Sequence, residues 1–330
     1  MDFDVRGVTS SRRNRDLVSG ATIPIMRRFD ERERSELATE VARRFPNGPS
    51  GRTHWTDLLL DYGDSGLAPP HLLTEITSGD DHKFWASVWE AMLYRHLNSL
   101  NLGVSGTVGK GGQRGPDFRI EYQGKAIWIE AVTPAPTGLP AEWLAPPARG
   151  EIRVRSMPHE AMLLRWTSVL RDKRHKLEQY ANTGIIGAGD ASIVAVNCCC
   201  LSDFAVSDHG ISQLPFAVEA AFPIGPLGVP ISRDGEIAGE AKHIPRFNIR
   251  KHQTATVPTG IFLDPSYANV SAVMSAYQRD TIRQPLALTM VHNPHATAPL
   301  ALGFLGALRE YFAEQQEDGY SLRWTTGEPA

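Results

Sequence analysis

Residues 117–132 (DFRIEYQGKAIWIEAV) combine two short apolar segments with a two-residue break at Gln123-Gly124. A polar residue followed by glycine between two such segments is typical of a tight hairpin turn. We therefore predict two antiparallel strands, one opened by Asp117 and the other containing Glu130. A hairpin of this kind brings the two carboxylates together at one end of a sheet.

Glu130 stands within an apolar segment, which predicts a strand that is buried on both faces. Its neighbours are all apolar: Ile127, Trp128, Ile129, Ala131 and Val132. A buried carboxylate requires a partner or a metal ion. Asp117 and Glu130, next to glycine-rich backbone, can hold Mg²⁺ or Mn²⁺, which would lower the pKa of a bound water. The alternative is that Glu130 forms a structural salt bridge with an arginine.

Residues 80–101 are predicted to form a helix that begins with a cap at Asp80 or Asp81 and ends near Asn101 and Gly103. Glu90 lies on a largely apolar face of this helix. The residues three and four positions away are Ala86, Ser87, Leu93 and Tyr94. Glu90 is therefore a candidate third acid of the site, and the alternative is a salt bridge near the end of the helix.

The order of these residues resembles the signature of the PD-(D/E)XK nucleases, the restriction-endonuclease-like superfamily. The matching residues are Pro116-Asp117, Glu130 on its apolar strand and Glu90 on the preceding helix. The resemblance covers roughly residues 80–200. It implies a three-layer α/β core with a mixed central sheet, and hydrolysis of phosphodiester bonds that depends on Mg²⁺ or Mn²⁺ held by Asp117, Glu130 and Glu90. It favours DNA over RNA as the substrate.

The lysine of this signature is displaced. In the family it stands two residues after the strand glutamate, on the same face, but this chain has Val132 there. Lys173 is the replacement candidate, because at 100° per residue it falls within an apolar helical stripe. The stripe consists of Trp166, Val169, Leu170, Leu177 and Tyr180. The chain resembles family members whose lysine lies on a neighbouring helix, which implies that Lys173 is catalytic. The alternative is a lysine that snorkels to solvent.

Basic residues are concentrated between positions 149 and 176, where the local net charge is +5. We predict that four of them contact nucleic-acid phosphates, namely Arg153, Arg155, Arg165 and Lys176. A solvated helix face is the alternative. The net charge of the whole chain is -3 at pH 7, which excludes a uniformly basic coat but not a basic groove.

The three cysteines are consecutive, at positions 198–200. This spacing suits neither a disulfide framework nor a CxxC zinc site, so we expect buried, reduced thiols in a cytoplasmic protein. The first residues lack the apolar core of a signal peptide, and no stretch approaches the length that spans a bilayer. We therefore expect no membrane partner.

The chain is predicted to have three sections. Residues 1–79 form a mostly helical extension, residues 80–200 the nuclease-like core, and residues 201–330 an α/β elaboration packed on that core. Within the elaboration, the patterns predict strands at 260–264 and 285–294 and helices at 267–280 and 302–316. A homodimer is one candidate assembly.

Two other functions fit the same residues. In the first, the chain has the nuclease fold and binds nucleic acid without catalysis, and Val132 marks a real loss of the lysine. In the second, the chain is a structural or regulatory protein whose carboxylates pair with arginines. His292 and His295 flank Pro294 without the third ligand that zinc requires, which predicts a structured turn.

Overall fold

The computed structural model describes residues 28–46, 48–106, 114–148, 150–202, 208–251, 255–279, 286–306, 309–317 and 319–326. The predicted helical extension is thus described from residue 28 onward. Within the described part of the chain, none of the helices combines the length and hydrophobicity that crossing a membrane requires.

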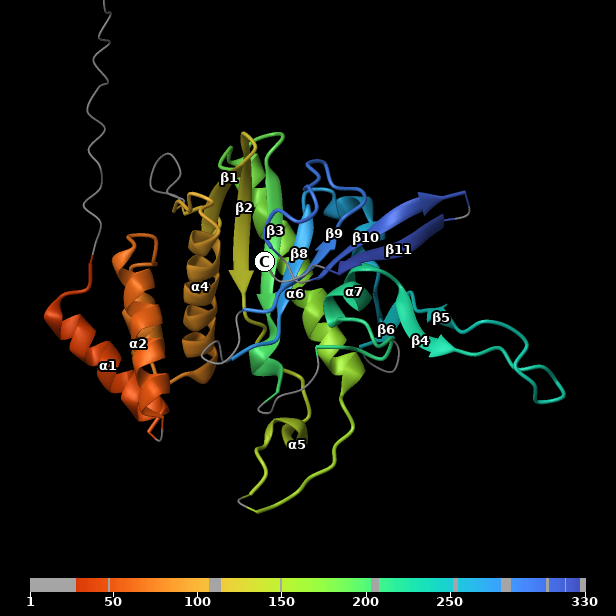
Figure 1. Ribbon diagram of the computed structural model, residues 1–330, viewed down its shortest axis with the longest axis horizontal. Helices are drawn as coiled ribbons and strands as arrows, with labels where there is room; N and C mark the ends of the chain where they lie inside the picture. The colour runs from red at the N-terminus through yellow and green to blue at the C-terminus, as the bar shows by residue number, and fades with distance from the viewer. Residues whose placement is uncertain are drawn as a thin grey trace, which may run out of the picture.

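A seven-stranded mixed sheet forms the centre of the molecule (Figure 1). In sheet order its strands are β1 (Phe118–Tyr122), β2 (Lys125–Val132), β3 (Ala191–Asn197), β8 (Ala272–Ala276), β9 (Thr289–His292), β10 (Arg309–Gln316) and β11 (Gly319–Thr326). The pairs β1–β2, β8–β9 and β10–β11 are antiparallel, whereas β2–β3, β3–β8 and β9–β10 are parallel. The predicted α/β class with a mixed sheet is confirmed. The sheet also crosses the section boundary expected at residue 200, because β8 to β11 continue it.

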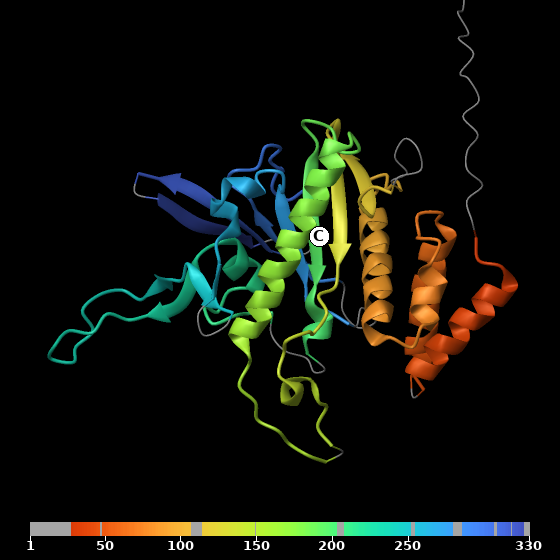
Figure 2. The ribbon, with the colours of Figure 1, turned by 180° about the vertical axis from the view of Figure 1, so that it is seen from behind.

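Helices cover both faces of this sheet (Figures 1 and 2). On one face lies α4 (Asp81–Ser99), with α1 (Glu31–Arg44), α2 (Pro49–Asp64) and α3 (Leu72–Thr77) beyond it; on the other lie α6 (His159–Asn182) and α7 (Phe216–Ala221). Alternate residues of β3 supply two separate cores. Ile193 and Ala195 belong to the core that contains α4, and Val194 and Val196 to the one that contains α6.

The predicted β1–β2 hairpin is confirmed, with its turn at Gln123-Gly124. Gln123 and Gly124 both have positive φ, 50° and 75°, as a two-residue type I′ turn requires. Phe118 pairs with Ile129 across the hairpin. Extending this register by one residue brings Asp117 opposite Glu130, so the turn sets the position of the two carboxylates.

The helix predicted at residues 80–101 is confirmed as α4. The Asp80 side chain accepts hydrogen bonds from the backbone N–H groups of His82 and Lys83, which fixes the start of α4. The apolar strand β3 ends at Asn197, because the Asn197 side chain caps a 3-10 helix, η1 (Cys198–Leu201). The three thiols are buried and free, as expected.

The C-terminal third differs from the sequence predictions in three places. The helices predicted at 267–280 and 302–316 are wrong, because these segments contain β8 and β10. β8 is buried on both faces and therefore lacks the alternation that marks an exposed strand. β10 is rich in good helix formers, but pairing with β9 and β11 decides its conformation. The strand predicted at 260–264 is a 3-10 helix, η2 (Ile261–Leu263).

The remaining elements lie outside the central sheet. They are α5 (Ala141–Leu144), β4 (Ile224–Gly228), β5 (Lys242–Pro245), β6 (Asn248–Arg250), β7 (Thr256–Pro258) and η3 (Pro265–Tyr267). β4 and β5 form an arm that projects away from the sheet (Figure 1).

Candidate active site

Three acidic side chains from three different elements share one electrostatic environment. Glu90 lies on α4, Asp117 directly precedes β1, and Glu130 lies on β2. Burial, followed by the charge of Asp117, raises the pKa of Glu90 to about 8. Burial, followed by the charge of Glu130, raises the pKa of Asp117 to about 6. The fold therefore brings the three predicted acids together, and they repel one another when all are ionised.

Glu130 is held by two amines from α6. Its Oε1 atom accepts hydrogen bonds from Lys173 Nζ at 2.5 Å and from Lys176 Nζ at 2.7 Å. The carboxylate is fully buried, with 0% of its surface exposed. Its other oxygen, Oε2, is buried and has no hydrogen-bond partner among the described residues. The inward direction predicted for Lys173 is confirmed, and the partners of Glu130 are lysines rather than the arginine of the alternative.

Lys176 lies nearer to the acids than its predicted role as a phosphate contact suggests. Burial alone would lower its pKa, but the Glu130 carboxylate and Tyr180 outweigh burial, so the pKa lies above its ordinary value. The signal in the sequence was the three-residue spacing from Lys173, which places both amines on one side of the helix. The ammonium group is retained at any physiological pH.

Asp117 is oriented by the backbone of the neighbouring strand. Its Oδ2 atom accepts a hydrogen bond of 2.7 Å from the Ala131 N–H. This bond favours the ionised carboxylate, but burial and Glu130 have the larger effect on its pKa. The hairpin thus supplies both the acid and the donor that orients it.

A tyrosine from the N-terminal helices completes the surroundings of Glu90. The Tyr62 hydroxyl, on α2, donates a hydrogen bond of 3.0 Å to Glu90 Oε2. Burial and the nearby Glu90 and Asp117 raise the pKa of Tyr62 well above its usual value, so the hydroxyl keeps its proton. Sequence reasoning missed Tyr62, because nothing local links it to an acid 28 residues away.

The other predicted phosphate contacts bind groups of the chain itself. Arg153 forms an ion pair with Glu151. Arg155 donates to the backbone oxygens of Trp143 at 2.8 Å and Ala145 at 2.6 Å. Arg165 Nε donates to the Ala135 oxygen at 2.9 Å. These arginines brace the long connection between β2 and α6, and their contact with nucleic acid stays a prediction.

The histidine-containing turn is structural, as its sequence predicted. His292 Nε2 lies 3.0 Å from Glu310 Oε2 on β10. The Asn293 amide donates to the backbone oxygens of Tyr267 and Val270 at 2.9 Å each. These bonds fasten the turn to the end of the sheet.

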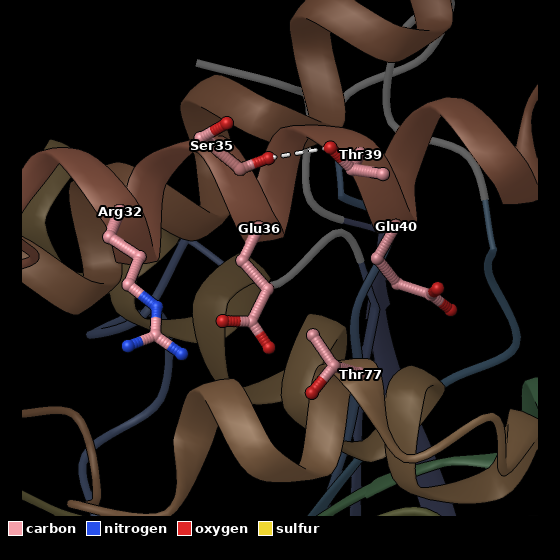
Figure 3. Close-up of a pocket in the computed structure, with 6 residues that line it drawn as sticks. All are labelled: Arg32, Ser35, Glu36, Thr39, Glu40 and Thr77. Atoms are coloured by element: carbon pink, nitrogen blue, oxygen red, sulfur yellow. Dashed lines mark hydrogen bonds between the residues drawn. The ribbon is translucent and has the colours of Figure 1, made fainter.

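A polar hollow of about 480 Å³ lies on the N-terminal helices and contains none of the three acids. It is lined by Arg32, Ser35, Glu36, Thr39, Glu40 and Thr77 (Figure 3). The dashed bond in Figure 3 joins the Thr39 hydroxyl to the Ser35 backbone oxygen within α1. This hollow therefore adds no group to the site.

The arrangement does not include a closed metal cluster. In the described part of the chain, no three His, Cys, Asp or Glu side chains are grouped tightly enough to enclose an ion by themselves. The side chains nevertheless supply the ligands that hard cations prefer, because all three are carboxylates. One of their oxygens, Glu130 Oε2, is buried and has no hydrogen-bond partner among the described residues. Comparison with protein-family models, curated proteins and solved structures finds no match, so the site must be interpreted from its own geometry.

Proposed function

We propose that this chain is a metal-dependent nuclease that hydrolyses phosphodiester bonds, with DNA favoured over RNA. The observation that carries the proposal is the meeting of Glu90, Asp117 and Glu130 with a lysine amine 2.5 Å from Glu130. These groups correspond in kind and in order to the acids and the displaced lysine of the PD-(D/E)XK resemblance. The mixed sheet with helices on both faces is compatible with such a core.

The residues present fit a divalent cation, Mg²⁺ or Mn²⁺. Burial raises the pKa of both Glu90 and Asp117, and a neighbouring carboxylate raises each further, Asp117 beside Glu90 and Glu130 beside Asp117. A cation would relieve the repulsion between these carboxylates. Asp117 and Glu130 would hold the ion, and Glu90 would contribute through a second ion or a bound water. When bound, the cation supplies a water of lowered pKa and neutralises charge on the phosphate.

The protein groups around these acids have separate tasks in this proposal. Lys173 orients the attacking water and stabilises negative charge on the phosphate oxygens. Lys176 remains paired with Glu130 when Lys173 turns toward the substrate, because both amines contact the same carboxylate oxygen. Tyr62 positions Glu90 through its hydroxyl.

One observation favours a second candidate function. Two amines already neutralise Glu130, so the charge of this buried carboxylate is balanced without a metal ion. The chain would then bind nucleic acid without cleaving it, or serve a structural or regulatory role. Salt-sensitive binding of nucleic acid without cleavage would identify a binding protein. The absence of both binding and cleavage would identify a structural or regulatory protein.

The deciding experiment is a cleavage assay with Mg²⁺ or Mn²⁺ on single- and double-stranded DNA and RNA. Asp117→Asn and Glu130→Gln should each reduce cleavage by at least about 100-fold while circular dichroism shows a folded chain. Glu121→Gln is the matched control, since Glu121 lies exposed on the same hairpin and pairs with Arg119. Cleavage that survives in both site variants, or that is equally reduced in the control, would exclude the proposal.

A further inference from the structure

A cavity of about 700 Å³ lies beside α6 and contains none of the three acids. Its walls come from the outer face of α6, from the chain between Val257 and Tyr267, and from Thr137 and Gly138 in the loop after β2. Cavities of this size accommodate small organic molecules. The three wall segments are far apart in the sequence, so the cavity is a product of the fold.

The inner surface of this cavity is mainly apolar. Leu164, Val257, Ile261, Leu263 and Tyr267 contribute aliphatic and aromatic surface. Hydroxyl groups are added by Thr137, Thr167, Ser168 and Thr259. A ligand with an apolar body and a few polar groups would therefore best match the interior of the cavity.

Three cationic side chains line the same cavity, Arg165, Arg171 and Lys251, against a single acid, Asp264. Asp264 caps η3, where its Oδ1 accepts a hydrogen bond from the Ser266 N–H at 2.8 Å. The cations thus outnumber the acids, and the one carboxylate already has a partner. The lining carries a positive excess that an anionic group can neutralise.

The positive charges are only weakly neutralised by the chain. The ion pair of Arg171 with Asp172 has a separation of 3.8 Å, and 57% of the Arg171 side chain is exposed. Among the described residues, no ion pair or hydrogen bond to the Lys251 side chain is found. Arg165 is anchored through Nε to the Ala135 oxygen, which fixes the guanidinium at the cavity wall.

We propose that this cavity binds a small organic anion, with its apolar or aromatic body inside and its phosphate or carboxylate on Arg171 and Lys251. A nucleoside phosphate and a long-chain carboxylate share this chemistry, and experiment distinguishes them. The site is separate from the acids: Arg171 faces the cavity and Lys173 faces Glu130, since side chains two residues apart point to opposite sides of a helix. The inference therefore does not depend on nuclease activity.

The test uses the anionic dye 1-anilinonaphthalene-8-sulfonate as a probe, titrated into the full chain and followed by fluorescence. The neutral analogue N-phenyl-1-naphthylamine measures the apolar contribution alone. We expect Arg171→Ala/Lys251→Ala to weaken dye binding by roughly tenfold and to leave binding of the neutral analogue unchanged. Ser168→Trp, which fills the cavity from α6, should abolish binding of both.

The matched control is Arg323→Ala, because Arg323 on β11 is as exposed as Arg171, with 57% of its side chain accessible. Equal dye affinity in the wild type and the double variant, equal loss in the control, or full binding in Ser168→Trp would overturn the proposal. Displacement of the dye by adenosine monophosphate would identify a nucleoside phosphate, and displacement by dodecanoate a long-chain carboxylate. If neither displaces the dye at millimolar concentration, the cavity does not take this class of ligand.

Discussion

Lys173 Nζ lies 2.5 Å from Glu130 Oε1 and joins the middle of α6 to the middle strand of the β1-β2-β3 group. Lys176 reaches the same oxygen from one helical turn further along. A single carboxylate oxygen thus accepts hydrogen bonds from two amines. Their exposure differs, because 19% of the Lys173 side chain is accessible to solvent and 43% of the Lys176 side chain. The two amines are therefore expected to substitute partly for each other.

This shared oxygen predicts non-additive effects on stability. Lys173→Met and Lys176→Met should each lower the free energy of unfolding by about 1–2 kcal/mol, because the remaining amine still neutralises Glu130. The double variant should lose at least about 1 kcal/mol more than the sum, since Glu130 is then buried without a cation. Urea unfolding of the four proteins measures the cycle. Strict additivity would mean that the two lysines act independently.

The crowded acids predict that stability falls as the pH rises. The folded-state pKa of Glu90, about 8, and of Asp117, about 6, lie above their unfolded values, so the folded chain binds more protons between pH 4 and 8. Their contribution is therefore fully present below pH 4 and is lost as the pH rises through 8. We expect a loss on the order of a few kcal/mol between pH 5 and 8, measured by urea unfolding. Glu90→Gln should flatten this decline, and an equal decline in that variant would contradict the assignment.

A bound divalent cation should reverse this loss. At pH 8, saturating Mg²⁺ or Mn²⁺ is expected to raise the melting temperature of the wild type, because an ion at 100 times its Kd stabilises a folded chain by about 2.7 kcal/mol. Asp117→Asn should respond much less, and Glu121→Gln should respond like the wild type. Thermal unfolding with and without the metal gives the comparison. A shift of equal size in all three proteins would indicate binding elsewhere on the chain.

The Tyr62 hydroxyl predicts a change in the pH profile of activity. Its hydrogen bond lowers the pKa of Glu90 against the larger effect of burial. Tyr62→Phe should therefore raise that pKa further and move the corresponding limb of the cleavage profile to higher pH, with a loss of stability of about 1 kcal/mol. Tyr122→Phe on β1 serves as the control for removing a tyrosine hydroxyl. A uniform loss of cleavage at every pH would assign Tyr62 a packing role alone.

The parts of the fold that sequence reasoning predicted correctly depend on short-range rules. The β1–β2 hairpin follows from the turn at Gln123-Gly124, and the start of α4 from the cap at Asp80. The direction of Lys173 follows from helical periodicity, because its neighbours on the stripe are apolar. In each case, residues close in sequence determine the local structure.

The errors concern segments whose conformation is decided by distant partners. β8 is buried between β3 and β9, and β10 pairs with β9 and β11, so their strands depend on neighbours that local patterns do not reveal. The contact between Tyr62 and Glu90 joins two helices, and no local rule predicts it. The contact of Lys176 with Glu130 is also beyond local rules, because a basic run does not show which of its members meets an acid.

The hydrogen bond from α2 to Glu90 makes the N-terminal helices part of the surroundings of the acids. α1 and α2 are not an independent extension, because Tyr62 is fully buried against α4 and Phe118. A shortened chain that begins at Asp80 would open Glu90 to water and expose the apolar side of α4. Such a fragment would keep every residue of the nuclease-like signature and still lose the dry surroundings that set the ionisation of its acids.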